Sequence, residues 1–255
     1  MSRPVDLHRL TWGEKGPLVV LVHGLTGRAS LWGDVARRLA AAGYRVVAPD
    51  LRGHGASPRA ASYTLAEHTA DLIALLEATG PAHLVGHSLG AALAWRVAAG
   101  RPDLVQRLVL EDQHPNAAPS GWQGWRDWAA AWPDAFASEE EGLEFLRHSG
   151  RTADWWRPSL QALPDGTWGW AMDKTAVVET ARSLCETEGW ADLSRLRCPT
   201  LIIRGADSPH LKAEVAERMA ATIPGARLVT VPGRDHWVHR EAGPYTALLT
   251  EFFGA

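Results

Sequence analysis

Ser88 lies at the centre of the clearest chemical pattern in the chain, because residues 86–90 read Gly-His-Ser-Leu-Gly and match G-x-S-x-G. The apolar run at 82–85 is typical of a buried strand, and residues 91–99 are typical of a helix. At such a strand–turn–helix corner a serine hydroxyl is exposed, and the flanking glycines leave room for the sharp turn. The first N–H groups of the helix favour negative charge beside that hydroxyl. The pattern therefore predicts a nucleophilic serine.

A serine hydroxyl becomes a useful nucleophile when an imidazole accepts its proton and a carboxylate orients that imidazole. Six polar residues directly follow predicted strands, and they are His23, Asp50, Ser88, Asp112, Asp207 and His236. We expect these side chains to gather at one edge, because open parallel sheets bind ligands at the carboxyl ends of their strands. The order serine, acid, histidine along the chain agrees with a hydrolase triad.

The elements that must position these residues alternate along most of the chain. Strands are predicted at 5–12, 18–22, 44–48, 82–85, 105–110, 200–203 and 226–231. Helices are predicted at 30–42, 63–79, 91–99, 211–221 and 245–253. This alternation predicts an α/β fold with a mostly parallel central sheet and helices on both faces.

The alternation stops between residues 113 and 196, where the sequence is helical in character and rich in tryptophan. Nine of the 13 tryptophans lie between Trp122 and Trp190. We therefore predict a core formed by residues 1–112 and 197–255, with residues 113–196 inserted as a helical cap above Ser88. About half of these tryptophans would form the cap's own core, and the rest would line an apolar pocket for a bulky substrate. The tryptophans assigned to the pocket are Trp122, Trp125, Trp128, Trp155 and Trp156.

Composition and charge limit the classes of partner. A formal net charge of −3 predicts binding neither to nucleic acid nor to an anionic membrane surface. The chain has neither the ~20-residue apolar run of a transmembrane helix nor the apolar N-terminal core of a secretory signal. Cys185 and Cys198 are expected to be free thiols in a reducing cytoplasm, with a disulfide as the alternative. The histidines and cysteines show no metal-ligand spacing, so we expect neither a metal nor a cofactor. The oligomeric state is left open.

Five stretches of the chain together resemble the α/β-hydrolase superfamily, with landmarks from about residue 18 to the C-terminus outside the insertion. They are His23-Gly24, residues 50–55 (Asp-Leu-Arg-Gly-His-Gly), residues 86–90, residues 204–207 (Arg-Gly-Ala-Asp) and residues 235–237 (Asp-His-Trp). The resemblance implies that Ser88 is the nucleophile, that His236 is the general base and that a carboxylate after a strand orients the imidazole. It also implies an oxyanion hole formed by the backbone N–H groups of Leu25 and Leu89.

Two aspartates are candidates for the orienting acid. Asp207 occupies the position that resembles the usual one in the family, after the penultimate strand, and is the first choice. Asp112 is the alternative. It follows the strand that comes after the helix at 91–99, and some members of the superfamily are similar in having the acid at this place.

Taken with the tryptophans of the insertion, the resemblance leads us to predict a cofactor-independent serine hydrolase. Its substrate would be a carboxylic ester or lactone with a bulky hydrophobic or aromatic group. Two alternatives remain open. The same fold could act on an amide or carbon–carbon bond or as a lyase, or the chain could be a non-catalytic ligand-binding protein.

Overall fold

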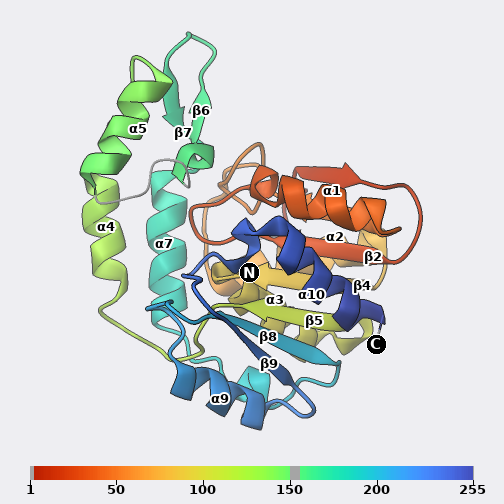
Figure 1. Ribbon diagram of the computed structural model, residues 1–255. Coiled ribbons are helices and arrows are strands. Elements are labelled where there is room, and N and C mark those ends of the chain that lie inside the picture. The colour runs from red at the N-terminus through yellow and green to blue at the C-terminus, as the bar shows by residue number, and fades with distance from the viewer. Residues whose placement is uncertain (1–2, 150–155, 255) are drawn as a thin grey trace.

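A seven-stranded sheet forms the centre of the computed structural model, which describes residues 3–149 and 156–254 (Figure 1). The strands lie in the order β1-β3-β2-β4-β5-β8-β9. Neighbouring strands of this sheet are parallel, except that β1 pairs antiparallel with β3. Their bounds are β1 (Arg9–Trp12), β2 (Leu18–Val22), β3 (Arg45–Pro49), β4 (Ala82–His87), β5 (Val105–Glu111), β8 (Thr200–Gly205) and β9 (Arg227–Val231). The predicted α/β fold with a mostly parallel sheet is confirmed.

The middle strands are continuous apolar runs because both of their faces are covered. All five residues of β2 and all six of β4 are buried. Alternate side chains enter opposite layers, as Val20 and Leu84 join one hydrophobic cluster while Val19 and Val85 join the other. This double burial fixes the sheet position of the strand that ends next to Ser88.

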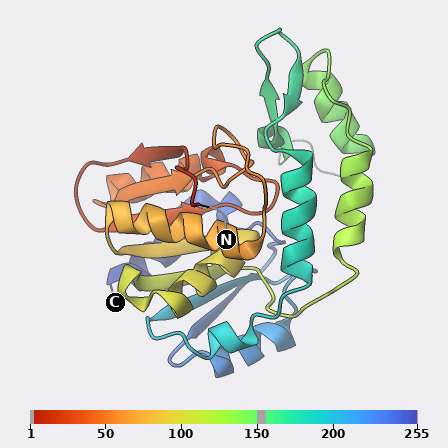
Figure 2. The same ribbon diagram turned by 180° about the vertical axis from the view of Figure 1, so that it is seen from behind.

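Helices cover both faces of the sheet (Figures 1 and 2). One layer contains α1 (Gly33–Ala41) and α10 (Ala242–Gly254), and the other contains α2 (Leu65–Thr79), α3 (Leu89–Gly100), α8 (Trp190–Leu193) and α9 (Ala213–Thr222). Short 3-10 turns connect elements in the described part of the chain, and they are η1 (Ala29–Trp32), η2 (Pro102–Leu104), η3 (Arg157–Ser159) and η4 (Val238–Arg240). Within residues 3–149 and 156–254, every helix is too short or too polar to cross a membrane.

The segment between β5 and β8 stands beside the sheet, on the left in Figure 1 and on the right in Figure 2. It contains α4 (Trp122–Ala130), α5 (Glu139–His148), β6 (Leu160–Ala162), β7 (Trp168–Trp170) and α7 (Lys174–Cys185). Helix α4 packs along α7. The hairpin of β6 and β7 was not predicted, because two three-residue strands are too short to show an alternating pattern in a tryptophan-rich stretch.

Candidate active site

Ser88 occupies the sharp turn between β4 and α3, as the G-x-S-x-G pattern predicts. Its backbone has φ 53° and ψ −121°, a region that non-glycine residues rarely adopt. Two sets of hydrogen bonds hold it there. The Ser88 N–H donates to the Glu111 carbonyl oxygen at 2.9 Å, and the Ser88 carbonyl oxygen accepts the N–H groups of Ala91 and Ala92 at 2.9 and 3.1 Å. The strained turn presents the side chain of Ser88 to a cavity.

The glycines around Ser88 are required by close backbone contacts. A Cβ atom at Gly86 would lie 2.2 Å from the carbonyl oxygen of Gly90. A Cβ atom at Gly90 would lie 2.2 Å from the carbonyl oxygen of Val22, in β2. The turn is therefore wedged directly against the neighbouring strand, which only residues without side chains permit.

His236 faces the same cavity and is oriented by a buried carboxylate. Its Nδ1 lies 2.8 Å from Oδ2 of Asp112, and the two residues are 7% and 0% exposed. Burial, together with the neighbouring His210, lowers the pKa of His236 well below its ordinary value, so the ring is neutral at pH 7. With its single proton on Nδ1 toward Asp112, the ring keeps Nε2 as an acceptor, which is the tautomer a general base needs.

The structure corrects the first choice of acid, because the carboxylate beside His236 belongs to Asp112 and not to Asp207. Asp207 is exposed, and its N–H donates to the Arg234 carbonyl oxygen at 2.8 Å. The two aspartates follow adjacent strands, β5 and β8, so the order of elements alone does not separate them. The backbone conformation of Asp112 is unusual. Its φ is 48°, in the left-handed region that aspartate tolerates better than most residues.

Two residues missed by the sequence analysis complete the surroundings of Asp112. The Ser208 hydroxyl donates to Oδ2 of Asp112, and the Gly205 N–H donates to Oδ1 at 3.2 Å. The ring of His210 lies 4.0 Å from that of His236. Burial raises the pKa of Asp112 to about 7, against the opposing effect of these hydrogen bonds. For Ser208 and His210, the only signal in the sequence is that they follow β8.

The loop that carries Leu25 is held by two buried histidines. The Leu51 N–H donates to His23 Nε2 at 3.0 Å, so Nδ1 of His23 carries the proton and donates to the Gly24 carbonyl oxygen at 2.7 Å. Nε2 of His54 lies 2.6 Å from the Leu25 carbonyl oxygen. Burial and the neighbouring His54 lower the pKa of His23 to about 3, which keeps this ring neutral. The carbonyl groups of Gly24 and Leu25 are thus each held by a buried imidazole.

The two residues expected to form the oxyanion hole, Leu25 and Leu89, both lie near Ser88. Leu89 is the first residue of α3, where N–H groups have no acceptor within the helix. Leu25 lines the cavity together with Ser88. The strand–loop arrangement therefore brings both expected donors to the nucleophile's end of the sheet.

The cavity at Ser88 has a volume of about 470 Å³ and three indole walls, Trp125, Trp156 and Trp237. Two of the five predicted pocket tryptophans are therefore in its lining. Trp128 packs instead among Trp125, Trp132, Trp156 and Trp170. Trp122 lies under the guanidinium groups of Arg126 and Arg182, each 5.5 Å from its ring. Trp155 lies outside the described residues.

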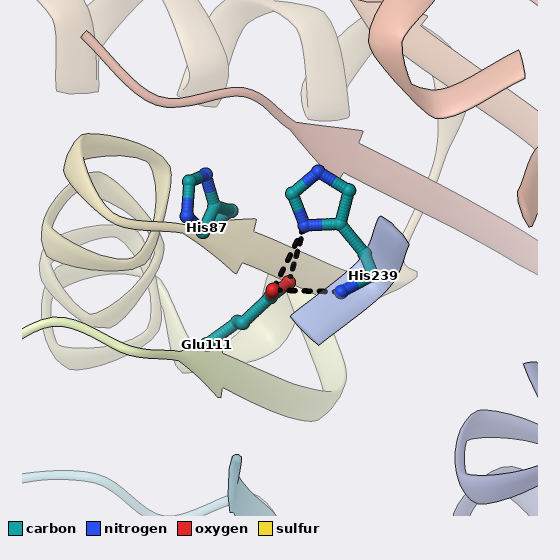
Figure 3. A group of neighbouring side chains, drawn as sticks. All are labelled: His87, Glu111 and His239. Atoms are coloured by element: carbon teal, nitrogen blue, oxygen red, sulfur yellow. Dashed lines mark hydrogen bonds and ion pairs between the residues drawn. The ribbon is translucent and has the colours of Figure 1, made fainter. Parts of the chain in front are cut away.

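A second cluster, His87, Glu111 and His239, has its possible ligand atoms within 4.8 Å of one another (Figure 3). The ring of His87 lies 4.6 Å from that of His236. Glu111 accepts the His239 N–H at 3.0 Å and lies 2.8 and 3.0 Å from His239 Nδ1. His87 Nε2 donates to the His236 carbonyl oxygen at 2.9 Å. Although burial would raise it, His239 and His87 hold the pKa of Glu111 below its ordinary value. These hydrogen bonds connect residues 236–239 to the ends of β4 and β5.

Comparison with known proteins gives a consistent picture over most of the chain. Residues 17–242 match the family model described as the alpha/beta hydrolase fold. The chain is 37% identical over 185 residues to Lipase LipV from Mycobacterium tuberculosis, covering 68% of this chain and 69% of the relative. It is 30% identical over 271 residues to 2-(acetamidomethylene)succinate hydrolase from Mesorhizobium japonicum, covering 100% and 96%. The crystal structure of E-2-(acetamidomethylene)succinate hydrolase matches with a TM-score of 0.86 and 29% identity, over 100% of this chain and 99% of the other.

Proposed function

The chain belongs to the alpha/beta hydrolase fold family and is a hydrolase, and from this premise we propose that it is a serine hydrolase of carboxylic esters or lactones. One observation carries the proposal. The neutral His236, 2.8 Å from the Asp112 carboxylate, lines the same cavity as Ser88. This is the combination of base, orienting acid and exposed hydroxyl that acyl transfer to serine requires.

The proposed reaction proceeds through an acyl-enzyme. Ser88 Oγ attacks the carbonyl carbon while His236 Nε2 takes the hydroxyl proton, and Asp112 stabilises the resulting imidazolium. The N–H groups of Leu25 and Leu89 stabilise the oxyanion of the tetrahedral intermediate. The imidazolium then gives its proton to the leaving alkoxide. Water, deprotonated by His236, attacks the acyl-enzyme, and Ser88 recovers its proton as the acid leaves.

The walls of the cavity support a bulky hydrophobic substrate group. Trp125 and Trp156 come from the segment between β5 and β8, and Trp237 follows the general base directly. Flat apolar walls of this kind favour an aromatic or cyclic group through burial and ring contacts. We therefore interpret residues 113–196 as a cap that closes the cavity above Ser88 and selects the substrate.

The experiment that tests the proposal is intact-mass analysis after incubation with a fluorophosphonate. We expect one label per wild-type chain and none on Ser88→Ala. Asp112→Asn should label and hydrolyse esters about 10³- to 10⁴-fold more slowly, because the imidazole then loses its orienting carboxylate. Asp207→Asn is the matched control and should react at the wild-type rate. A wild-type protein that neither labels nor hydrolyses nitrophenyl esters would contradict the proposal.

An amide substrate is the second candidate, because the relative aligned over this whole chain carries an acetamido group in the name of its substrate. The same triad can attack an amide carbonyl, in which case His236 must protonate a poorer leaving group. Paired nitroanilide and nitrophenyl substrates with the same acyl group distinguish the two. An anilide rate within tenfold of the ester rate would favour an amidase.

A further inference from the structure

The loop after β8 brings a hydroxyl, rather than a carboxylate, to the pair of His236 and Asp112. Ser208 is 6% exposed, and its hydroxyl donates to Oδ2 of Asp112. The same oxygen lies 2.8 Å from Nδ1 of His236. The Ser208 oxygen itself accepts the His210 N–H at 3.1 Å. Because this N–H occupies the oxygen, the hydroxyl proton is directed at Asp112.

We propose that Ser208 is a positioning residue of the hydrolysis, which keeps Asp112 ionised and directed at His236. The inference rests on the proposed function, because it assigns Ser208 a role in the same reaction. An O–H donor stabilises the carboxylate more than the carboxylic acid, since the acid already has a proton of its own to place. Ser208 therefore shifts the protonation equilibrium of Asp112 toward the ionised form.

The protonation state matters because it decides the tautomer of the general base. Ionised Asp112 accepts the Nδ1 proton of His236, and Nε2 is then free to accept from Ser88. A protonated Asp112 would instead donate to Nδ1, and the proton of the neutral ring would lie on Nε2. That tautomer cannot take the serine proton, and the site would be inactive although every side chain is in place.

The surroundings of Asp112 place its ionisation equilibrium close to neutral pH. Burial raises the pKa of Asp112 to about 7, and the Ser208 hydroxyl and the Gly205 N–H oppose the rise. Four titratable side chains interact with Asp112. They are Glu111 on β5, His114 in the following loop, His210 after β8 and His236. Glu111 raises the pKa further and His210 lowers it. Removing one hydroxyl alters none of these groups.

Ser208→Ala tests the proposal through the pH dependence of kcat/KM and of fluorophosphonate labelling. A hydrogen bond to a charged group corresponds to about one to two pKa units, so the acid limb should move up by about that much. At pH 7 the rate should fall by about 5- to 50-fold, and near pH 10 it should approach that of the wild type. Recovery at high pH is the result that a purely structural defect would not produce.

Two controls bracket the expected shift. Ser208→Thr retains the hydroxyl and should keep the acid limb where the wild type has it. Asp207→Asn removes an exposed charge from the adjacent residue and should also leave the limb in place. The proposal is overturned if Ser208→Ala loses the same factor at every pH, or if Asp207→Asn moves the limb as far as Ser208→Ala does.

A measurement that needs no turnover separates this proposal from the proposed function. The carboxyl carbon of Asp112 can be titrated by NMR in the wild type and in Ser208→Ala, and its pKa should be higher in the variant. A higher pKa in a protein that does not react with fluorophosphonates would refute the hydrolase and retain the hydroxyl's effect on Asp112. An unchanged pKa in an active enzyme would refute the role of Ser208 alone.

Discussion

Asp112 is a fully buried carboxylate whose ionisation works against the folded state. Burial raises its pKa to about 7, whereas in an unfolded chain an aspartate ionises near pH 3.9. Between these values the native state retains a proton that the unfolded state releases, so this group lowers the free energy of unfolding as the pH rises from about 4 to about 7. Above pH 7 the accumulated penalty is up to about 4 kcal/mol.

Asp112→Asn should therefore stabilise the protein that it inactivates. At pH 8 we expect a gain of about 1–3 kcal/mol over the wild type, after allowing for the weakened hydrogen bond to His236. The gain should shrink as the pH falls toward 4, where the wild-type carboxyl group is neutral in the native state. Urea unfolding at pH 5 and pH 8 measures both values. Asp207→Asn, at an exposed site, should show no such trend, and a gain that grew at low pH would contradict the argument.

Single residues differ in how far their roles can be predicted from sequence. That Ser88 and His236 line one cavity follows from residue type and position, because few other arrangements place serine in a tight turn and histidine after the last strand. The choice between Asp112 and Asp207 could not be made, since both follow adjacent strands and the direction of the side chain depends on one backbone angle. Ser208 was missed because a serine in a loop has no distinguishing pattern.

At the scale of elements, the turn that carries Ser88 is limited by the space between β4, β2 and α3. Gly86→Ala should destabilise the protein by at least about 3 kcal/mol, because the added Cβ would meet backbone atoms of residues 90 and 91 that cannot move independently. Gly100→Ala, at the exposed end of the same helix, meets nothing within 4 Å and should stabilise it by about 0.5–1 kcal/mol. Thermal unfolding of both variants checks the prediction. Equal changes in stability for Gly86→Ala and Gly100→Ala would contradict it.

Helix α4 presents one tryptophan to the cavity and another away from it, which gives a matched pair of substitutions. Trp125 lines the cavity, whereas Trp122 packs on Arg126 and Arg182. Trp125→Ala should raise KM for an aromatic ester by about tenfold, with little change for an acetate ester, because a ring contact contributes about 0.5–1.5 kcal/mol. Trp122→Ala should leave the ratio of the two KM values unchanged. A similar ratio in both variants would show that the substrate does not reach Trp125.

Elements with a clear pattern were predicted to within a few residues, and the exceptions have physical causes. A continuous apolar run marked β2, and shorter apolar runs marked β4 and the second half of β5, because strand segments covered on both faces need few polar residues. The hairpin of β6 and β7 was missed because its pairing depends on tertiary contacts. The backbone N–H of Phe136 donates to the Trp168 carbonyl oxygen at 2.7 Å, and the N–H of Trp168 donates back to Phe136 at 2.8 Å.

At the scale of the whole molecule, the segment between β5 and β8 is tied to the sheet domain by buried polar contacts. His68 on α2 lies 2.9 Å from the Thr180 hydroxyl on α7, which itself donates to the Tyr63 carbonyl oxygen at 3.1 Å. The Ser183 hydroxyl accepts the Leu65 N–H at 3.0 Å. Because His68 and Thr180 are fully buried, separating the two parts would break these hydrogen bonds and expose both side chains to water.

Thr180→Val should therefore weaken both parts together. We expect a loss of about 2–4 kcal/mol, because the buried His68 N–H and the Tyr63 carbonyl both lose a partner. Thr187→Val, at an exposed position just beyond α7, is the control and should change stability by less than about 0.5 kcal/mol. Near-ultraviolet and far-ultraviolet circular dichroism should report one shared transition in Thr180→Val. A separate early loss of the near-ultraviolet signal would show that the segment unfolds independently.

The neighbouring rings of Trp128, Trp132, Trp156, Trp170 and Trp237 form an indole cluster whose fluorescence can be measured without a label. Trp132 and Trp170 stack at 4.1 Å, Trp128 lies 4.6 Å from Trp132 and 5.3 Å from Trp156, and Trp156 lies 6.4 Å from Trp237. At these separations excitation energy passes between rings before it is emitted, so light absorbed anywhere in the cluster can reach Trp237. That last ring lies 5.1 Å from His236, whose imidazolium form would quench it. Intrinsic fluorescence should therefore respond, without any label, to the charge of His236, whose ring is nearer to Trp237 than that of His87 at 6.2 Å.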